Sequence, residues 1–559
     1  MKKILTGVGL AGMILASGCL EQSGAGSRSY KGPLFRYHFA GRAQLPSGTS
    51  TNRLKEIDAL PITGELRGQL ADKLAATAWP FWRKDLPAGT ANQGALLRPL
   101  WDDFLAAEAY VEVRGAPGRT DTALAIELSD ERAQLWSAKL KQLMAAWKLG
   151  TPRDIAAEGF KGWEAKKAPA PGTFRFFRAG KWVLLALAQD NPEQLPALLQ
   201  EARKTGRPVP ALSGRFLDLA VDFPGLRPWF PLGSFPLPPV LASMSGLGEN
   251  VRTEVKFQYS SKIPWTYEAW KIPTNLISEP LISFTLGQGI APLLRQVKGL
   301  AEVGLDPMPN QFCCWGIKHA QCRMFVTLPV PHAVETMRAT AAAWPKFLQS
   351  TLTNSHGEFF YVSNRAELVW GSLPFSVPVI HAEQNGKDEF LFAAIFPLQS
   401  PPTPVPEELF AQVRGRTNLI YYDWELTDER LVHGKQFYQL LYFADSRRLP
   451  PTNTVSKRWL SAIRPKLGNT ITEITQSGPQ ELSLVRKSHL GFTGFEIATF
   501  SAWLDTPGFP LSFEMPPALL RSPTHASPTR AGAAATRTNK PAGKATSPPK
   551  TSPPPGGKP

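Results

Sequence analysis

The sequence predicts an α+β fold of mainly antiparallel sheets with helices packed on one face of each sheet. Three observations support this class: hairpins are frequent, helices and strands do not alternate strictly, and the order of elements recurs along the chain. In "VIHAEQNGKDEFLFAAIF" (379–396), for example, two strand-like runs flank Asn385-Gly386, a dipeptide typical of two-residue hairpin turns. Parallel strands need long crossovers, so frequent hairpins favour antiparallel pairing.

The recurring order is strand, helix, strand pair, hairpin, helix and strand. The first copy comprises 35–45, 65–82, 109–129, 174–188, 191–207 and 215–223, and the second comprises 321–330, 332–348, 358–372, 379–396, 405–416 and 418–426. The first helix of each copy is alanine-rich and runs into Ala-Trp-Pro. We interpret this order as an internal duplication, with two unrelated α+β stretches as the alternative.

The chain of 559 residues is too long for one core, and its 16 tryptophans supply ample material for several. We therefore expect two repeat domains, at 31–303 and 311–520, joined by a linker around "GLDPMPN" (304–310). The first domain carries an extra helix at 129–150, where Ser129 can cap the start and Gly150 can end the helix.

The N-terminus, "MKKILTGVGLAGMILASGCLEQSG", has Lys2 and Lys3 before an apolar run, 4–15, that is too short to span a membrane. Ala16-Ser17-Gly18-Cys19 follows. This arrangement resembles the signal peptide and lipobox of bacterial lipoproteins, although Ala16 stands where that family usually has leucine. The resemblance implies removal of 1–18, lipid on Cys19 and a short linker at 19–30. An ordinary secretory signal is the alternative.

If Cys19 carries lipid, the protein is anchored to a membrane of the cell envelope. Cys19 is followed by Leu20 and not by aspartate, which by the sorting rule of that family implies the outer membrane. Neither the periplasmic nor the surface side is favoured.

The C-terminal segment, 521–559, has no acidic residue and seven lysines and arginines. With almost no large apolar side chains it cannot bury enough surface to offset its chain entropy, so we expect a disordered tail. It could contact an anionic lipid or envelope polymer, or simply be solvated. These charges account for much of the formal net charge of +16, and no nucleic-acid motif accompanies them, so a nucleic-acid partner is not expected.

The stretch "QFCCWGIKHAQCRMF" (311–325) gathers Cys313, Cys314, His319 and Cys322. Three interpretations compete: a zinc site, a disulfide from Cys322 to Cys313 or Cys314, and buried thiols that act as small apolar side chains. Adjacent cysteines on a strand point to opposite faces, which counts against zinc. No metal or cofactor is predicted.

Two strands each carry a pair of carboxylates on one face: Asp218 with Asp222 in 215–223, and Asp423 with Glu425 in 418–426. Paired carboxylates can perform acid–base catalysis. The competing interpretation is the solvent-facing side of a half-buried sheet. No GxSxG, HExxH or phosphate-loop motif accompanies them.

These observations predict a non-enzymatic binding or scaffolding protein of the cell envelope. One alternative is a carrier of an apolar ligand, such as a lipid, between the two halves. The other is a hydrolase that uses the carboxylates above. No specific ligand or oligomeric state is indicated by the sequence.

Overall fold

The computed structural model describes most of the chain between residues 32 and 510. The described ranges are 32–45, 52–77, 94–116, 119–147, 149–166, 172–188, 192–227, 237–263, 265–297, 300–319, 323–351, 358–371, 377–396, 403–444 and 453–510. Cys19, Cys322 and the tail 521–559 lie outside them, so the expectations for lipidation and tail disorder concern residues that are not described. No helix within the described ranges is both long and apolar enough to cross a membrane.

The α+β class is confirmed, with a single large antiparallel sheet of 20 strands. The first strand set is β1 (Phe35–Phe39), β2 (Ala109–Ala116), β3 (Arg119–Glu127), β4 (Arg153–Ala157), β5 (Phe160–Lys166), β6 (Thr173–Ala179), β7 (Trp182–Ala188), β8 (Arg215–Val221), β9 (Val240–Leu247) and β10 (Asn250–Gln258). The second strand set is β11 (Leu281–Gln288), β12 (Gln311–Ile317), β13 (Arg323–Pro329), β14 (Glu358–Val362), β15 (Glu367–Gly371), β16 (Val379–Asn385), β17 (Asp388–Ala394), β18 (Leu419–Leu426), β19 (Asn469–Gly478) and β20 (Glu481–Ser488).

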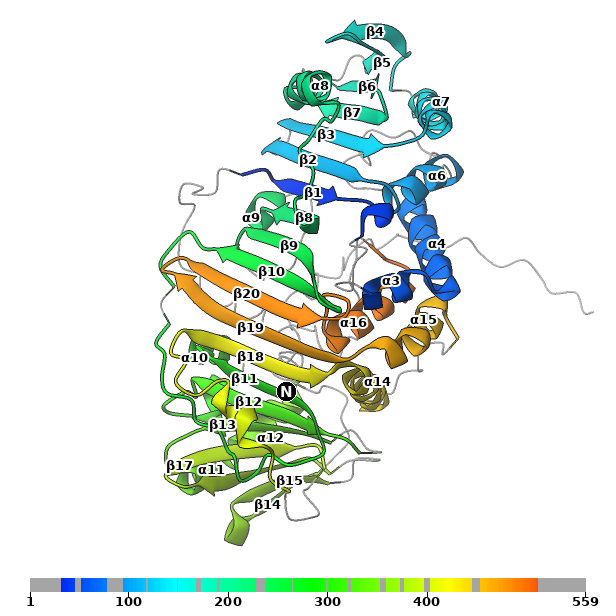
Figure 1. Cartoon of the computed structure of the whole chain (residues 1–559). Helices are drawn as coiled ribbons and strands as arrows, with labels where there is room; N and C mark the ends of the chain where they lie inside the picture. The colour runs from blue at the N-terminus through cyan, green and yellow to red at the C-terminus, as the bar shows by residue number, and fades with distance from the viewer. Residues whose placement is uncertain are drawn as a thin grey trace, which may run out of the picture. The chain divides into compact units, whose positions relative to one another are not determined.

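The two strand sets have the same internal order. Hydrogen-bonded neighbours in the first set run β4-β5-β6-β7-β3-β2-β1-β8-β9-β10. The second set runs β14-β15-β16-β17-β13-β12-β11-β18-β19-β20. The sets meet where β10 pairs antiparallel with β20 (Figure 1).

The strand pairing places the junction between the two sets at 259–280, which is earlier in the chain than the linker predicted at 304–310. The reason is β11, which pairs with β12 and β18 and therefore belongs to the second set. Its sequence, "LISFTLGQ", is rich in apolar residues and is buried along its whole length.

The correspondence of elements that the sequence predicts agrees only in part with the strand order of the sheet. By position in the sheet β1 corresponds to β11, whereas the sequence order paired 35–45 with β13. Similarly, β2 and β3 correspond to β12 and β13, and not to 358–372. The first match rested on alanine-rich helices. Such a composition is common in buried helices, so it gives little information on where an element lies in the sheet. The β6–β7 hairpin and β8 do occupy the places of β16–β17 and β18.

Helices pack on both faces of the sheet, so the expectation of one covered face is wrong. In the first set α7 (Asp130–Ala146) packs on Val183 and Leu185 of β7, while α8 (Gln194–Thr205) packs on Leu184 and Ala186 of the same strand. Successive strand residues point to opposite faces, so these helices lie on opposite sides. In the second set α11 (Ala333–Thr340) and α12 (Ala343–Thr351) cover one face and α13 (Glu407–Ala411) the other.

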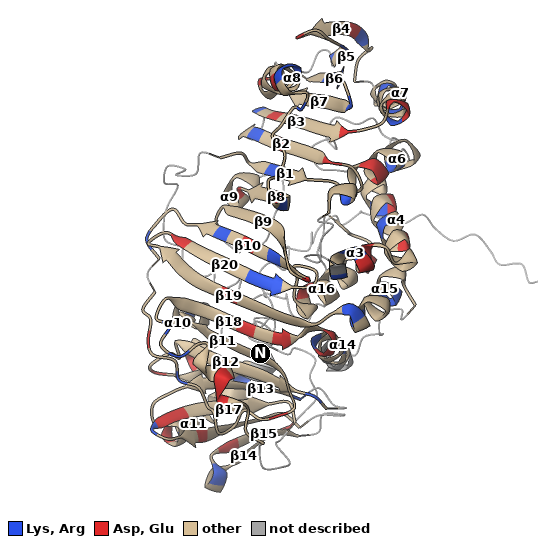
Figure 2. Ribbon diagram, in the orientation of Figure 1, with Lys and Arg blue, Asp and Glu red and all other residues tan. Residues whose placement is uncertain are grey.

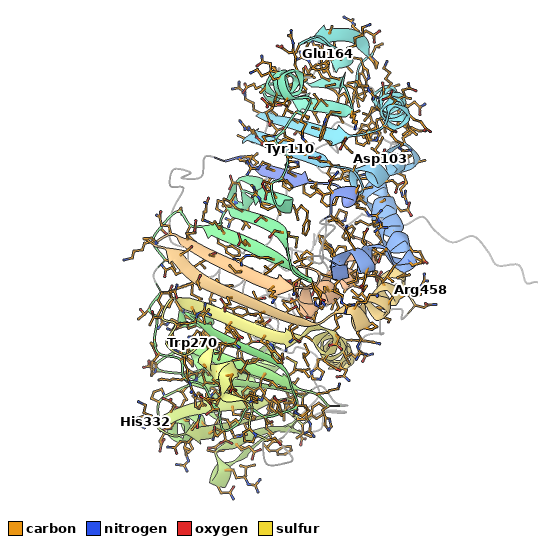
Figure 3. All side chains as sticks on the ribbon, in the orientation of Figure 1. Asp103, Tyr110, Glu164, Trp270, His332 and Arg458 are labelled. Atoms are coloured by element: carbon orange, nitrogen blue, oxygen red, sulfur yellow. The ribbon has the colours of Figure 1, made fainter. Side chains whose placement is uncertain are left out.

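The extra helix predicted at 129–150 is confirmed as α7. Ser129 Oγ accepts a hydrogen bond from the Arg132 N–H at 3.3 Å, which satisfies one free amide of the first turn. Trp136 is buried on its inner face and donates its indole N–H to Asp103 of α6 (Gly94–Phe104) at 2.7 Å (Figure 3). A hydrogen bond therefore links α6 and α7.

A helical cluster joins the two strand sets. It contains α3 (Asn52–Asp58) and α4 (Pro61–Ala76), which follow β1, and α14 (Thr427–Ala444), α15 (Val455–Ile463) and α16 (Gly494–Asp505), which come from the second half. The indole of Trp459 donates to Thr63 Oγ1 at 3.1 Å across this core. The remaining short α-helices are α9 (Phe223–Leu226) and α10 (Ala291–Gln296).

Candidate functional site

A row of polar side chains crosses the centre of the sheet, one from each of six neighbouring strands. We call it the polar row: Cys314, Thr285, Asp423, Thr472, Arg486 and Thr253. Direct cross-strand neighbours share a face, so all six point to the same side. All six are buried. Glu496 of α16 bonds Arg486, Gly491 just before that helix accepts from Thr253, and Met324 and Ile395 pack on Cys314.

Asp423 and Glu425 are 3% and 1% exposed, so the expectation of a solvent-facing carboxylate pair on β18 is wrong. Thr285 Oγ1 donates to Asp423 Oδ1 at 2.6 Å, and the Gly494 N–H donates to Glu425 Oε1 at 2.7 Å. Arg430 of α14 places its Nε 3.8 Å from Glu425 Oε2. Glu425 thus holds the first residue of α16 and a cation of α14 against the sheet, whereas Asp423 is bonded within the sheet.

Arg486 of β20 holds the same end of α16. Its Nε donates to Thr472 Oγ1 at 2.9 Å, and its terminal nitrogens donate to Glu496 at 2.6 and 3.0 Å. Glu496 also accepts the Thr493 N–H at 2.9 Å and completes the cap of α16. Figure 2 shows acidic positions on β18 and basic positions on β20 towards the strand ends beside α14 and α16.

Burial changes the protonation of this cluster. It raises the pKa of Asp423, and burial together with the Asp423 charge raises the pKa of Glu425 to about 7. Burial and the Arg430 charge lower the pKa of His433 on α14 to about 4, so this imidazole is neutral at physiological pH. Glu425 therefore changes its protonation state near neutrality.

The other two candidate carboxylates do not join this cluster. The cross-strand partners of the polar row continue through Met244 of β9 to Leu217 of β8, so Leu217 lies on the same face as Asp423. Asp218, the next residue along β8, lies on the opposite face. Asp218 pairs with Arg215 at 2.8 Å. Asp222 follows β8 and accepts the Gly225 N–H at 3.1 Å as the N-cap of α9. The four carboxylates therefore form no common site.

Cys313 and Cys314 are free buried thiols on opposite faces of β12. Cys313 packs with Phe284 and Trp315, whereas Cys314 packs with Met324 and Ile395. Burial raises the pKa of Cys314 to about 11 and that of Cys313 well above its ordinary value, so both stay protonated. His319 lies just beyond the end of β12. Within the described ranges no three His, Cys, Asp or Glu side chains are grouped to hold a metal ion.

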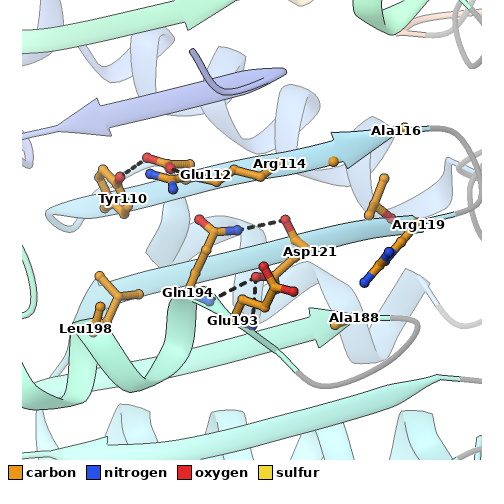
Figure 4. A pocket seen from close by; sticks show the side chains of 13 residues that line it. Tyr110, Glu112, Arg114, Ala116, Arg119, Asp121, Ala188, Glu193, Gln194 and Leu198 are labelled. Atoms are coloured by element: carbon orange, nitrogen blue, oxygen red, sulfur yellow. Dashed lines mark hydrogen bonds and ion pairs between the residues drawn. The ribbon is translucent and has the colours of Figure 1, made fainter. Parts of the chain in front are cut away.

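The open feature of the first strand set is a cavity of about 710 Å³, which we call the α8 recess (Figure 4). It lies between β2, β3 and the first turns of α8. Its lining includes the polar side chains of Tyr110, Glu112, Arg114, Arg119, Asp121, Glu193 and Gln194 and the apolar side chains of Ala188, Ala197 and Leu198. Its volume is within the roughly 300–1,000 Å³ of small-molecule sites.

Small side chains line part of this recess. On the face towards α8, β3 and β7 present Ala123, Ala125, Ala186 and Ala188. Ala125 and Ala186 pack against the buried leucines of α8, whereas Ala188 lies opposite Asp121 and lines the recess. The sheet is therefore close-packed under the centre of α8 and open beside its first turn.

Asp121 ties the start of α8 to β3. Its Oδ2 accepts the N–H groups of Glu193 and Gln194 at 3.0 and 2.9 Å, and the Gln194 amide donates to the Asp121 carbonyl at 2.8 Å. Asp121 Oδ1 is buried and has no hydrogen-bond partner among the described residues. That oxygen is enclosed within the protein, and Oδ2 is the oxygen that holds the start of α8.

Glu112 forms the second fixed polar group. It is 3% exposed and accepts hydrogen bonds from the Tyr110 hydroxyl and the Arg114 Nε. Burial and the Glu112 carboxylate raise the pKa of Tyr110, which keeps its hydroxyl a donor. The Arg114 side chain is 63% exposed, so its guanidinium stands at the rim.

The matching place in the second strand set is filled. Between β12, β13, β17 and α13 lie Trp315, Phe325, Phe392 and Phe410, which form one aromatic core. The segment 268–271, which contains Trp270 (Figure 3), also lies against this core and is held there by Gln288 and Gln311. The same strand arrangement therefore encloses a solid core in one set and a recess in the other.

A second cavity, of about 420 Å³, lies on the other side of α8. Leu195, Pro196 and Leu199 of the helix face an ion-paired group on β5 and β6. In that group Glu164 (Figure 3) bonds Arg175 at 2.8 Å and Lys166 at 3.0 Å. The charges there are already paired with one another.

The sequence did not point to the α8 recess. "AYVEVRG" and "TALAIELS" were expected as strands, and Glu112 and Asp121 were not distinguished from surface charges. The alternating alanines in "TALAI" and "LLALA" mark small buried positions, and of these Ala188 lines the recess. Comparison with protein-family models, curated proteins and solved structures finds no match to this chain.

Proposed function

We propose that this protein is a non-enzymatic, lipid-anchored binding protein of the cell envelope and that it binds its ligand in the α8 recess. One observation carries the proposal. The two strand sets have the same order, yet the recess is open in the first set and filled by aromatic side chains in the second. A gap that the same arrangement can fill, and that holds fixed polar groups, suits a ligand better than it suits stability.

The two strand sets are proposed to descend from a duplication. The repeated strand order, the matching positions of α8 and α13 and the antiparallel β10–β20 junction support this origin. After duplication, one copy would provide the ligand site and the other a solid support.

The location proposed is the outer membrane, through lipid on Cys19. The lipobox-like segment and the absence of aspartate after Cys19 support this location. The basic tail would add a weak, salt-sensitive contact with an anionic lipid or envelope polymer.

The two alternative functions find less support. Asp423 and Glu425 are buried, and Glu425 is bonded to the first residue of α16 and lies beside Arg430 of α14, so a substrate would have to displace a helix to reach the pair. The α8 recess lies within the first strand set and is lined by several charged groups, which suits neither a long acyl chain nor a site between the halves.

The test is native mass spectrometry of the full chain isolated from the envelope of the producing cell, before and after denaturation. We expect an added mass that is released on denaturation. Ala197→Trp, which places an indole at the recess, should abolish the added mass, because Ala197 lines the recess from α8. Ala342→Trp, at an exposed position in the second set, is the matched control and should retain it. No bound mass in the wild type, or an equal mass on Ala197→Trp, would refute the assignment.

A further inference from the structure

The sheet ends in two edge strands that expose different side chains. Among the described strands β4 pairs only with β5 and β14 only with β15, so these two strands lie at opposite ends of the sheet (Figure 1). An edge strand leaves backbone donors and acceptors open to another chain. On β4 both Arg153 and Asp154 are exposed, and charge at an edge discourages pairing. The sequence of β14 is "EFFYV", with its one charge at the first position.

An apolar patch adjoins the β14 edge. Phe360 is 49% exposed and Val377 is 43% exposed. The Phe360 ring lies against Gly371, where an added Cβ would be 2.7 Å from the ring. The Trp370 N–H donates to the Pro378 carbonyl at 2.9 Å, and the register of β15 with β16 places Val377 beside Gly371. The exposed apolar surface therefore runs from the start of β16 to the open edge of the sheet.

The chain already extends its sheet by pairing two equivalent strands. β10 and β20 are the last strands of their sets, and Glu254 and Val485 are each the fifth residue of their strand. These two residues lie directly opposite each other in the antiparallel pair. The β10–β20 pairing is therefore symmetric in the way that a two-fold dimer interface is symmetric.

The residues of β14 suit the same kind of pairing with a second copy. When β14 pairs antiparallel with itself over its five residues, Phe360 lies at the two-fold axis. The two Phe360 rings become direct cross-strand neighbours and cover each other. Phe359 then faces Tyr361 and Glu358 faces Val362, so no two like charges are opposed. β14 is therefore complementary to itself.

We infer that two copies of this protein associate through β14, which pairs antiparallel with β14 of the second copy about Phe360. The interface is closed, because each copy contributes the same strand to it. This association does not depend on a ligand in the α8 recess.

Sedimentation equilibrium of the full chain in a density-matched detergent measures the dissociation constant of the dimer. Phe360→Lys puts two ammonium groups opposite each other at the axis. It should raise the dissociation constant at least about tenfold. Val334→Lys, the same kind of change at an exposed apolar position of α11, is the matched control and should associate as the wild type does.

Phe360→Cys tests the register of the pairing. Direct cross-strand partners have Cβ atoms about 4.5–5.5 Å apart, so a mild oxidant should join the two copies by a disulfide at this position. Val377→Cys, at a similarly exposed position two strands away from the edge, is the control and should stay unlinked. Peptide mass spectrometry identifies the linked position.

A dimer that Phe360→Lys weakens, that Val334→Lys retains and that Phe360→Cys links supports the inference. A monomer at the highest soluble concentration overturns it, and so does a dimer that Phe360→Lys leaves unchanged. A weakened dimer without the Phe360→Cys link overturns the pairing about Phe360. A link at Val377→Cys in its place would put the contact on the face of the sheet and overturn the edge pairing. A different polypeptide that co-purifies in equal amount and is lost on Phe360→Lys would overturn the assignment of a second copy.

Discussion

At the scale of single residues, Glu425 is an ionisable side chain held almost entirely away from water. It is buried beside a second carboxylate, and its folded-state pKa of about 7 lies above the ordinary value of 4.5. Between these two pH values the folded state holds more protons than the unfolded state. Stability therefore falls as pH rises through this window, and the full penalty remains at higher pH.

Glu425→Gln should remove this penalty, since glutamine can still accept the Gly494 N–H but carries no charge. We expect the free energy of unfolding at about pH 8 to rise by about 1–3 kcal/mol and its decline between about pH 5 and 7 to flatten. Urea denaturation across this pH range measures both. Glu254→Gln, an exposed carboxylate on β10, should leave the profile unchanged. An unaltered slope in Glu425→Gln would show that another group titrates.

Cys313 and Cys314 give a second prediction at this scale. Both are buried and free, so alkylation without reductant should label neither in the native protein and both in concentrated guanidinium. Peptide mass spectrometry reads the labels. A peptide in which either residue is joined to Cys322 would contradict the description of two free thiols.

At the scale of elements, α16 depends on the bidentate contact between Arg486 and Glu496. Arg486→Met leaves Glu496 without its cation in a largely buried place, so we expect a loss of about 3 kcal/mol or more in the free energy of unfolding. Arg252→Met breaks an exposed pair with Glu254, and both residues belong to β10, the strand beside β20. This change should lower the free energy of unfolding by less than about 1 kcal/mol. Chemical denaturation compares the two, and equal losses would argue against a special role for the α16 contact.

Elements with local signals could be predicted from sequence, and those that depend on distant segments could not. Ser129 and the spaced tryptophans define α7, and Asn385-Gly386 defines the β16–β17 hairpin, since capping and turn chemistry are local. Asp423 and Glu425 were correctly placed on a strand that alternates, but their burial depends on α14 and α16 returning over β18. The hollow at Ala188 likewise depends on where α8 crosses the sheet. Neither arrangement can be predicted from a short stretch of sequence.

At the scale of the whole described body, the helical cluster of α3, α4, α14, α15 and α16 links the strand sets. Leu66→Ala in α4 should therefore destabilise both sets together, by about 2–4 kcal/mol and in one transition. Hydrogen exchange should report faster opening in β18 and β19 as well as in the first set. Leu195→Ala in α8 is the matched control, and its effect should stay within the first set. Separate transitions in Leu66→Ala would contradict this coupling.

The β10–β20 pairing also sets an order of events during synthesis. β20 (Glu481–Ser488) is the last strand of the sheet to be made, so β10 remains an unpaired edge while more than two hundred residues that follow it emerge. Arg252, Glu254 and Lys256 alternate along β10 and put charge on that temporary edge, which discourages pairing with other chains. A nascent chain thus carries its own protection against aggregation until its final strand arrives.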